Sequence, residues 1–246
     1  MLQYYKNEGY KLMSSGNQNK EIYASTINLV EQLKLPFLQI IKQLELSTFD
    51  AKLHHLNNAK ISAEYAIKLI DNYILSLKIE NQEIDYYPET FLVSTVLNNS
   101  AQYLENLAKM YGVDLKILVE NKTTPVMGNR IILESAILSV GMSLVEAVAT
   151  NAKPTLYFAT HRSRHGVVAG IYTEDIKISA KLLKEGRKYK GKSSQPLQNL
   201  LYSSGAGIFI ADNLFNSLKL NMLVSKHKNL YGLGAILNCS QQLKLV

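Results

Sequence analysis

Apolar residues recur in steps of three and four along two stretches in the first third of the chain, which places them on one face of a helix. The first stretch begins near Gln18, and the second follows a turn at residues 47–50. The apolar positions are Ile27, Val30, Leu33, Phe37, Ile40 and Leu44 in the first, and Leu53, Leu56, Ala63, Ile67, Ile70, Ile74 and Leu77 in the second. Two long helices with a short connection pack as an antiparallel hairpin. Because a hairpin alone leaves much of such a stripe exposed, we expect residues 22–80 to form a dimeric four-helix bundle, preceded by a polar lead-in over residues 1–21.

Beyond residue 80 the pattern changes to alternating helices and strands. Residues 83–87 predict a short strand, Pro88 suits the first turn of a helix, and Gly112 suits the end of that helix. Further helices are expected from Asn129 to about Thr150 and over residues 203–217, strands over 113–120, 155–160, 167–173, 218–225 and 231–238, and loops over 121–128 and 181–192. This order predicts an α+β sandwich over residues 84–246, behind the N-terminal helical hairpin.

Composition narrows the class of protein. Hydrophobic residues make up 47% and charged residues 19% of the 246 positions, which excludes a mostly disordered chain. A single cysteine excludes an internal disulfide and favours a reducing compartment. No apolar run approaches the roughly 20 residues of a membrane span, so we expect a cytoplasmic protein without a membrane partner. The formal charge of +7 suits an acidic partner or a phosphate-bearing ligand, but it is too diffuse to indicate nucleic-acid binding.

Two short motifs give the chain a resemblance to a known family. The first is the helical run Glu31-Gln32-Leu33-Lys34-Leu35-Pro36-Phe37, and the second is Gly205-Ala206-Gly207-Ile208, where a glycine turn opens into an apolar helix. Together with the order of elements, they resemble the core of a bacterial sensor histidine kinase over residues 22–246. The first run is similar to that family's phosphoacceptor box, His-Glu-Leu-Arg-Thr-Pro-Leu, and the second to its glycine box. The resemblance implies a dimerising hairpin, an ATP-binding domain of the gyrase and MutL type, and a role in two-component signal transduction or a phosphorelay.

The phosphoacceptor position departs from that family. Glu31 stands where the family has its histidine, and a carboxylate cannot replace an imidazole that forms a phosphoramidate. His54 and His55 are the alternative acceptors, and at most one of them faces a given partner because adjacent helical residues point about 100° apart. The plain interpretations are a solvated acid on a helix face for Glu31, and surface or capping roles for the two histidines.

The phosphate and magnesium positions that the resemblance implies are altered as well. The family's magnesium-binding asparagine corresponds to Ser143 or Glu146, depending on the register of the helix after Asn129. A serine is a poor ligand for Mg²⁺, whereas a glutamate offers carboxylate oxygens. Gly205 and Gly207 are the candidates for phosphate contact, because amides at a helix start can face an anion. Their plain interpretation is close packing of the helix that follows.

The nucleotide site that the resemblance implies lacks the family's residues on its adenine side. The family's Asp-x-Gly-x-Gly turn corresponds to Thr173, Asp175 and Lys177, so both glycines are missing and a lysine side chain would enter the base pocket. The basic loop at 181–192 corresponds in position to the family's ATP lid, and its plain interpretation is a solvated, mobile loop. We therefore expect no cofactor and no metal ion, with ATP and Mg²⁺ as the alternative ligands of this region.

Three functions are compatible with these residues. The favoured hypothesis is a pseudokinase or adaptor that forms a homodimer through residues 22–80 and offers the surface around Glu31, Lys34 and Pro36 to a response-regulator-like or kinase partner. The first alternative is an unconventional histidine kinase or phosphotransfer protein that uses one of the two adjacent histidines. The second is a nucleic-acid-associated protein that uses the basic loop and the turn at 161–166, which we read as solvated.

Overall fold

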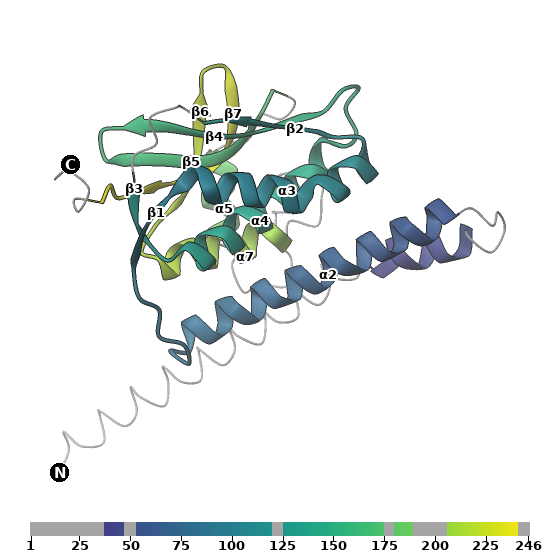
Figure 1. Ribbon diagram of the computed structural model, residues 1–246, viewed down its shortest axis with the longest axis horizontal. Coiled ribbons are helices and arrows are strands. Elements are labelled where there is room, and N and C mark those ends of the chain that lie inside the picture. Colours follow the sequence, from purple (N-terminus) through teal and green to yellow (C-terminus); the bar gives the residue numbers. More distant parts are fainter. Residues whose placement is uncertain (1–36, 47–52, 120–124, 175–179, 189–205, 241–246) are drawn as a thin grey trace, which may run out of the picture.

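The computed structural model describes residues 37–46, 53–119, 125–174, 180–188 and 206–240. Its elements form three layers: a five-stranded sheet, a set of helices on one face of that sheet, and the long helix α2 (Leu53–Glu80) beneath those helices (Figure 1). Residues 37–46 are also helical and lie alongside the start of α2. The α+β architecture predicted from the sequence is confirmed.

The main sheet is mixed. It contains, in spatial order, β2 (Asp114–Leu118), β4 (Thr155–Ser163), β5 (Gly166–Thr173), β7 (Leu230–Leu237) and β6 (Met222–His227). β2 runs parallel to β4, and the other neighbours are antiparallel. All five strands overlap the ranges that the sequence predicted for them. The individual strands are therefore specified by local sequence, whereas the sheet forms through long-range pairing between them.

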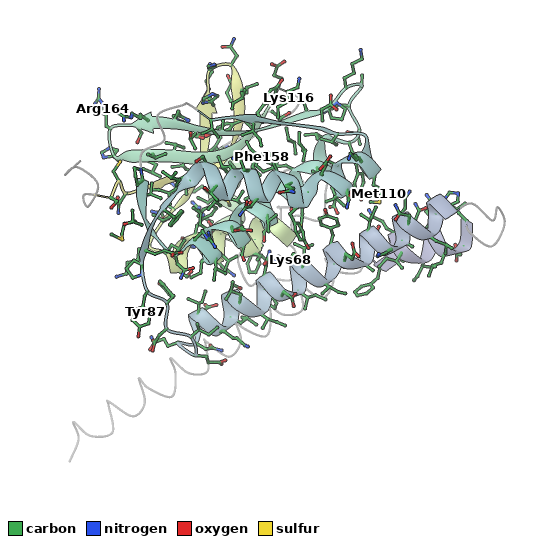
Figure 2. All side chains as sticks on the ribbon, viewed as in Figure 1. Lys68, Tyr87, Met110, Lys116, Phe158 and Arg164 are labelled. Atoms are coloured by element: carbon green, nitrogen blue, oxygen red, sulfur yellow. The ribbon has the colours of Figure 1, made fainter. Side chains whose placement is uncertain are left out.

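Three helices cover one face of the sheet and enclose the core. They are α3 (Val93–Tyr111), α4 (Arg130–Val148) and α7 (Ala206–Ser217). The side chain of Asn129 accepts a hydrogen bond from the N–H of Ile132 at 3.0 Å and so caps α4, as expected. Gly112 ends α3 in the left-handed conformation, with φ of 69°, also as expected. Phe158 of β4 is fully buried between the sheet and these helices (Figure 2).

Helix α4 is apolar around its circumference because it lies in the middle of the helical layer. It contacts α2, α3, α7 and the sheet. In the part of the chain that the structure describes, α4 is the one helix long and apolar enough to cross a membrane, and 83% of its apolar window is buried inside the protein. The expectation that no apolar run approaches the length of a membrane span is therefore wrong for this helix. Its apolarity is explained by protein contacts on all sides.

Two local predictions for the chain after α2 are wrong. Residues 83–87 form an irregular connection, and the strand lies later in the chain, as β1 (Glu89–Leu92). Pro88 accordingly precedes a strand instead of opening a helix. The predicted loop at 121–128 contains β3 (Pro125–Gly128), which pairs antiparallel with β1. These four-residue strands are too short to show a period, and only their pairing with each other defines them.

The predicted basic loop at 181–192 is also partly wrong, because residues 180–188 form the helix α5 (Ala180–Lys188). Leu183 on this helix is 4% exposed. A buried leucine in a strongly basic segment supplies the tertiary contact that makes a short helix stable, which the local pattern alone does not reveal.

Candidate functional site

The glycine at the start of α7 allows that helix to approach α4 very closely. A Cβ atom added to Gly207 would lie 2.0 Å from the carbonyl oxygen of Ser139 and 2.6 Å from the hydroxyl oxygen of Ser143. Ser143 is 3% exposed at this contact. The structure therefore brings two predicted site residues together, Gly207 and Ser143, in a tight contact between helices. The preceding glycine, Gly205, lies outside the described residues.

Glu146, the other candidate for the magnesium position, faces a different environment from Ser143. It lies near the C-terminal end of α4, close to Tyr111 at the end of α3. Burial raises the pKa of the Glu146 carboxyl to about 7. Burial and the negative charge of Glu146 together raise the pKa of the Tyr111 hydroxyl. At neutral pH a divalent cation would therefore compete with a proton for this carboxylate.

The first helix of the hairpin reaches the same place. The side-chain amide of Gln39 donates a hydrogen bond to the Tyr111 hydroxyl at 2.6 Å. Residues 37–46 thus contact the sandwich directly beside Glu146, at the end of α4. Glu146, one of the two positions that the sequence associates with magnesium, therefore lies near an aromatic side chain that is hydrogen-bonded to the hairpin.

An ion pair between Arg187 and Asp212 holds helix α5 against helix α7. The guanidinium of Arg187 donates from Nη2 to Oδ1 of Asp212 at 2.6 Å and from Nε to both carboxylate oxygens, at 3.1 and 3.2 Å. Nη2 also donates to the carbonyl oxygen of Met222 at 2.6 Å. A planar guanidinium suits this multidentate arrangement. The segment that corresponds in position to an ATP lid is therefore bound to α7 and β6.

Helix α2 is fastened to the sandwich by polar contacts inside an apolar interface. The side-chain amide of Asn72 donates to the carbonyl oxygen of Ser135 at 3.2 Å and to the hydroxyl of Ser139 at 3.0 Å, both on α4. Tyr65 packs edge-on against Tyr103 of α3 with ring centroids 5.5 Å apart, and its hydroxyl donates to the Tyr103 carbonyl oxygen. Close to these residues, Met110 of α3 faces α2 (Figure 2). These contacts hold the second hairpin helix against the helical layer.

The other predicted site residues are distributed over the hairpin. Glu31, Lys34 and Pro36 lie outside the described residues. The backbone of His54 is in the first turn of α2, and its side chain is not described. The imidazole of His55 is half-buried, and its Nδ1 donates to the side-chain carbonyl oxygen of Gln43 at 3.0 Å. His55 thus links the two helices of the hairpin.

A stripe of large apolar side chains remains exposed on the hairpin. We call it the hairpin stripe, and it consists of Phe37, Leu38, Ile41, Leu44 and Leu46 on the first helix and Leu56, Ile67 and Ile74 on α2. Ile67 is 58% exposed although the helix around it is largely packed against the sandwich. An apolar stripe of this length is typical of a surface that another protein chain covers.

Sequence reasoning missed a cluster on the opposite face of the sheet. His161 lies in β4 and not in a solvated turn, and its Nδ1 is 3.4 Å from Nδ1 of His227 at the end of β6. Both rings contact Tyr172, whose hydroxyl accepts a hydrogen bond from Ser225 at 2.8 Å. Burial raises the pKa of Tyr172 to about 12. Strand register alone brings these residues together, so no local signal could have identified them. Within the described ranges, no group of three or more histidine, cysteine, aspartate or glutamate residues could hold a metal ion.

Comparison with known proteins gives the fold and leaves the function open. No protein-family model and no curated protein matches the sequence. Among solved structures, the chain is similar to the histidine kinase AdeS of Acinetobacter baumannii, with 14% identity over 84% of this chain and 97% of that chain and a TM-score of 0.51. The catalytic domain of the histidine kinase ThkA has 10% identity over 62% of this chain and 98% of its own length, with a TM-score of 0.48. The cytoplasmic segment of the histidine kinase QseC has 8% identity over 68% of this chain and 93% of its own length, with a TM-score of 0.42. The chain therefore has the fold of a histidine kinase core, as its motifs predicted.

Proposed function

We propose that this chain is a histidine-kinase-like signalling protein that acts as a pseudokinase or adaptor. It forms a homodimer through its helical hairpin and binds a response-regulator-like or kinase partner, without autophosphorylation of the usual kind. The residues around Glu31, Lys34 and Pro36 supply the partner surface in this proposal.

The observation that carries the proposal is the state of the implied nucleotide site. The space that a glycine leaves at Gly207 is filled by α4, since a Cβ atom there would overlap Ser139 and Ser143 at 2.0 and 2.6 Å. The carboxyl of Glu146 is desolvated, which raises its pKa to about 7 and weakens it as a ligand for Mg²⁺. Neither arrangement favours the binding of a polyphosphate and its metal ion. Together with a glutamate at the phosphoacceptor position, they favour a protein that signals by binding.

The proposal of a homodimer is supported by the hairpin stripe. Its members recur on both helices of the hairpin, and several are about half exposed. Burial of apolar surface at roughly 25 cal/mol per Å² makes a second copy of the hairpin an energetically suitable cover. Dimerisation would bring two partner surfaces into one assembly.

Calorimetric titration with ATP, with and without Mg²⁺, tests the absence of kinase function. We expect no saturable heat and no transfer of the γ-phosphoryl group to the protein. Transfer of that group to the chain would contradict the pseudokinase proposal. Loss of an acid-labile phosphate in a variant that combines His54→Gln with His55→Gln would then assign the acceptor to this histidine pair. A phosphate retained in that variant would exclude both histidines.

A further inference from the structure

Two histidines meet on the face of the main sheet opposite the helical layer (Figure 1). His161 belongs to β4, and His227 is the last residue of β6. Their Nδ1 atoms are 3.4 Å apart, and the centroids of their rings are 5.4 Å apart. Because the centroids are farther apart than the nitrogens, each Nδ1 lies on the edge of its ring that faces the other ring. Both nitrogens therefore face the same small space between the two imidazoles.

The separation of these two nitrogens fits a shared metal ion better than a direct hydrogen bond. A hydrogen bond that an N–H group donates is usually about 2.7–3.2 Å long, which is shorter than the distance between the two Nδ1 atoms. Two nitrogens bound to one tetrahedral zinc ion, each at about 2.0–2.1 Å, lie about 3.3–3.4 Å apart. The distance between the two imidazole nitrogens is thus the edge length of a zinc coordination tetrahedron.

A buried tyrosine holds the two imidazoles in this arrangement. The ring centroid of Tyr172 lies 6.1 Å from that of His161 and 5.6 Å from that of His227. The Tyr172 hydroxyl accepts a hydrogen bond from Ser225 of β6 at 2.8 Å. A Cβ atom at Gly170 would lie 3.0 Å from the same hydroxyl, so the glycine leaves room for it. Since Tyr172 is fully buried, the two histidines pack on a fixed surface, and an ion that binds them pays little to order its ligands.

The two histidines differ in their exposure to water. His227 is 6% exposed, so one of the two nitrogens belongs to a side chain that is almost entirely removed from solvent. His161 is only partly buried. A metal site needs a path by which the ion enters as well as ligands at suitable distances. The partly exposed side of His161 supplies that path.

The basic residues next to these histidines are directed away from them. Successive side chains of a strand point to opposite faces of the sheet, so Arg162 and Lys226 lie on the other face from their histidine neighbours. The ammonium group of Lys226 lies over the ring of Tyr231, 5.4 Å from its centroid. Neither of these positive charges is therefore directed at the space between the imidazoles, although the chain as a whole is basic.

We propose that His161 and His227 bind a zinc ion through their Nδ1 atoms. Neutral imidazole is a common ligand of zinc, and tetrahedral coordination is usual for this ion. Two protein ligands are fewer than most zinc sites have, so water molecules complete the coordination. The ion joins β4 to β6, which are separated in the sheet by β5 and β7, and so crosslinks strands that do not pair. This inference goes beyond the proposed function and does not depend on it, because α4 and α7 lie on the other face of the sheet.

Nuclear magnetic resonance of the histidine side chains tests the site in the full wild-type chain. During titration with zinc chloride at neutral pH, we expect the Nδ1 resonances of His161 and His227 to shift together and to saturate at one ion per chain. The resonances of His165, an exposed histidine in the turn between β4 and β5, should not change. Absence of a shift at the two proposed ligands, or shifts confined to other histidines, would overturn the proposal. This measurement needs no variant and so does not depend on how a substitution affects folding.

Calorimetric titration with zinc chloride then measures what one ligand contributes. The variant His161→Gln should bind zinc at least about tenfold more weakly, because even outer-shell partners of a metal ligand typically contribute tenfold to 100-fold. The matched control is His165→Gln, which removes an exposed histidine from the same hairpin and should keep the wild-type affinity. Unchanged affinity in the His161 variant, or equal weakening in the control, would contradict the site.

Thermal unfolding separates loss of the ligand from loss of the fold. Without zinc, His161→Gln should unfold at nearly the same temperature as the wild type, because the altered residue is partly exposed and glutamine keeps a polar group there. Zinc should raise the unfolding temperature of the wild type and of His165→Gln, since an ion that binds only the folded chain stabilises it, and should not raise that of His161→Gln. An equal rise in all three proteins would place the zinc elsewhere and overturn the proposal.

Discussion

Gly207 is the residue at which a single methyl group matters most for the helical layer. A Cβ there would meet the backbone carbonyl of Ser139 at 2.0 Å, and a backbone atom in the centre of α4 has little room to move. The serines that face this glycine are buried, so the contact is part of the core. A residue that resembles part of a ligand-binding motif thus has a packing role that the structure explains fully.

Substitution Gly207→Ala is expected to destabilise the protein by about 1–3 kcal/mol, the usual cost of overpacking. The sign of this stability change is informative, because alanine has a better helix propensity than glycine. Propensity alone would stabilise α7 by about 1 kcal/mol. Urea unfolding measures the difference. Gly128→Ala is the matched control, because a Cβ there meets only the ring of Phe91, at 3.8 Å. Equal stability of the Gly207 variant and the wild type would contradict the close contact.

Glu146 should give the protein a stability that depends on pH. Its pKa is raised from 4.5 to about 7 in the folded state, so between these values the folded chain holds a proton that the unfolded chain has released. Stability therefore falls as pH rises through this window, by up to about 1.4 kcal/mol per pH unit, and the penalty is complete above the folded pKa.

Urea unfolding across the range from about pH 5 to about pH 8 tests this dependence. The variant Glu146→Gln should lose the decline, since a glutamine does not ionise. Glu105→Gln is the control, because Glu105 is an exposed acid that pairs with Lys109 on the surface of α3. Parallel pH profiles for the wild type and the Glu146 variant would contradict the assignment.

At the scale of elements, α5 shows how an ion pair defines a helix in a basic segment. Asp212 is 8% exposed, and the guanidinium of Arg187 is its ion-pair partner in the described structure. Leu183 adds apolar burial on the same helix. The helix depends on these two contacts with α7 and β6, since nine residues form a stable helix in water only with tertiary support.

Substitution Arg187→Ala should destabilise the protein by about 1–3 kcal/mol, between the values for exposed and buried ion pairs. Most of the cost arises because the carboxylate of Asp212 stays charged and loses its partner. Adding Asp212→Asn to Arg187→Ala should restore part of the loss, and a double-mutant cycle by urea unfolding measures the coupling. Additive effects of the two changes would show that the pair contributes nothing. Hydrogen exchange over residues 180–188 should speed up in the single variant.

At the scale of the whole molecule, the hairpin has two differently used faces. One face of α2 is buried against the sandwich through Asn72, Tyr65 and their partners. The other carries the exposed apolar side chains of Ile67 and Ile74, in line with Leu56 near the start of the helix. The proposed homodimer uses the second face, so dimerisation does not alter the contacts between α2 and the sandwich.

Light scattering after size exclusion tests this division of faces. The wild-type chain should be a dimer, and Ile67→Glu should be a monomer at the same concentration, because a glutamate in an apolar interface loses its hydration. Gln102→Glu introduces the same side chain at an exposed position of α3, which carries no member of the stripe, and should remain dimeric. A monomeric wild type, or a dimer that survives Ile67→Glu, would contradict the proposal.

Local pattern determined much of this protein. The helical period of α2, the cap at Asn129 and the left-handed glycine at 112 are decided by residues close in sequence, and each was predicted. The five sheet strands were likewise predicted from short stretches of local sequence. The motifs around these elements were sufficient to predict the fold of a histidine kinase core, which the comparison with AdeS bears out.

Tertiary structure decided what those elements contact. β1 and β3 exist because they pair with each other, α5 because Arg187 reaches Asp212, and the pair of His161 and His227 because two strands lie in register. The contact at Gly207 depends on which side of α4 faces α7. In each case the partners are separated by 25 to 68 residues. Periodicity and propensity are properties of neighbours in the chain, whereas desolvation, close approach and charge pairing depend on neighbours in space, which only the folded structure defines.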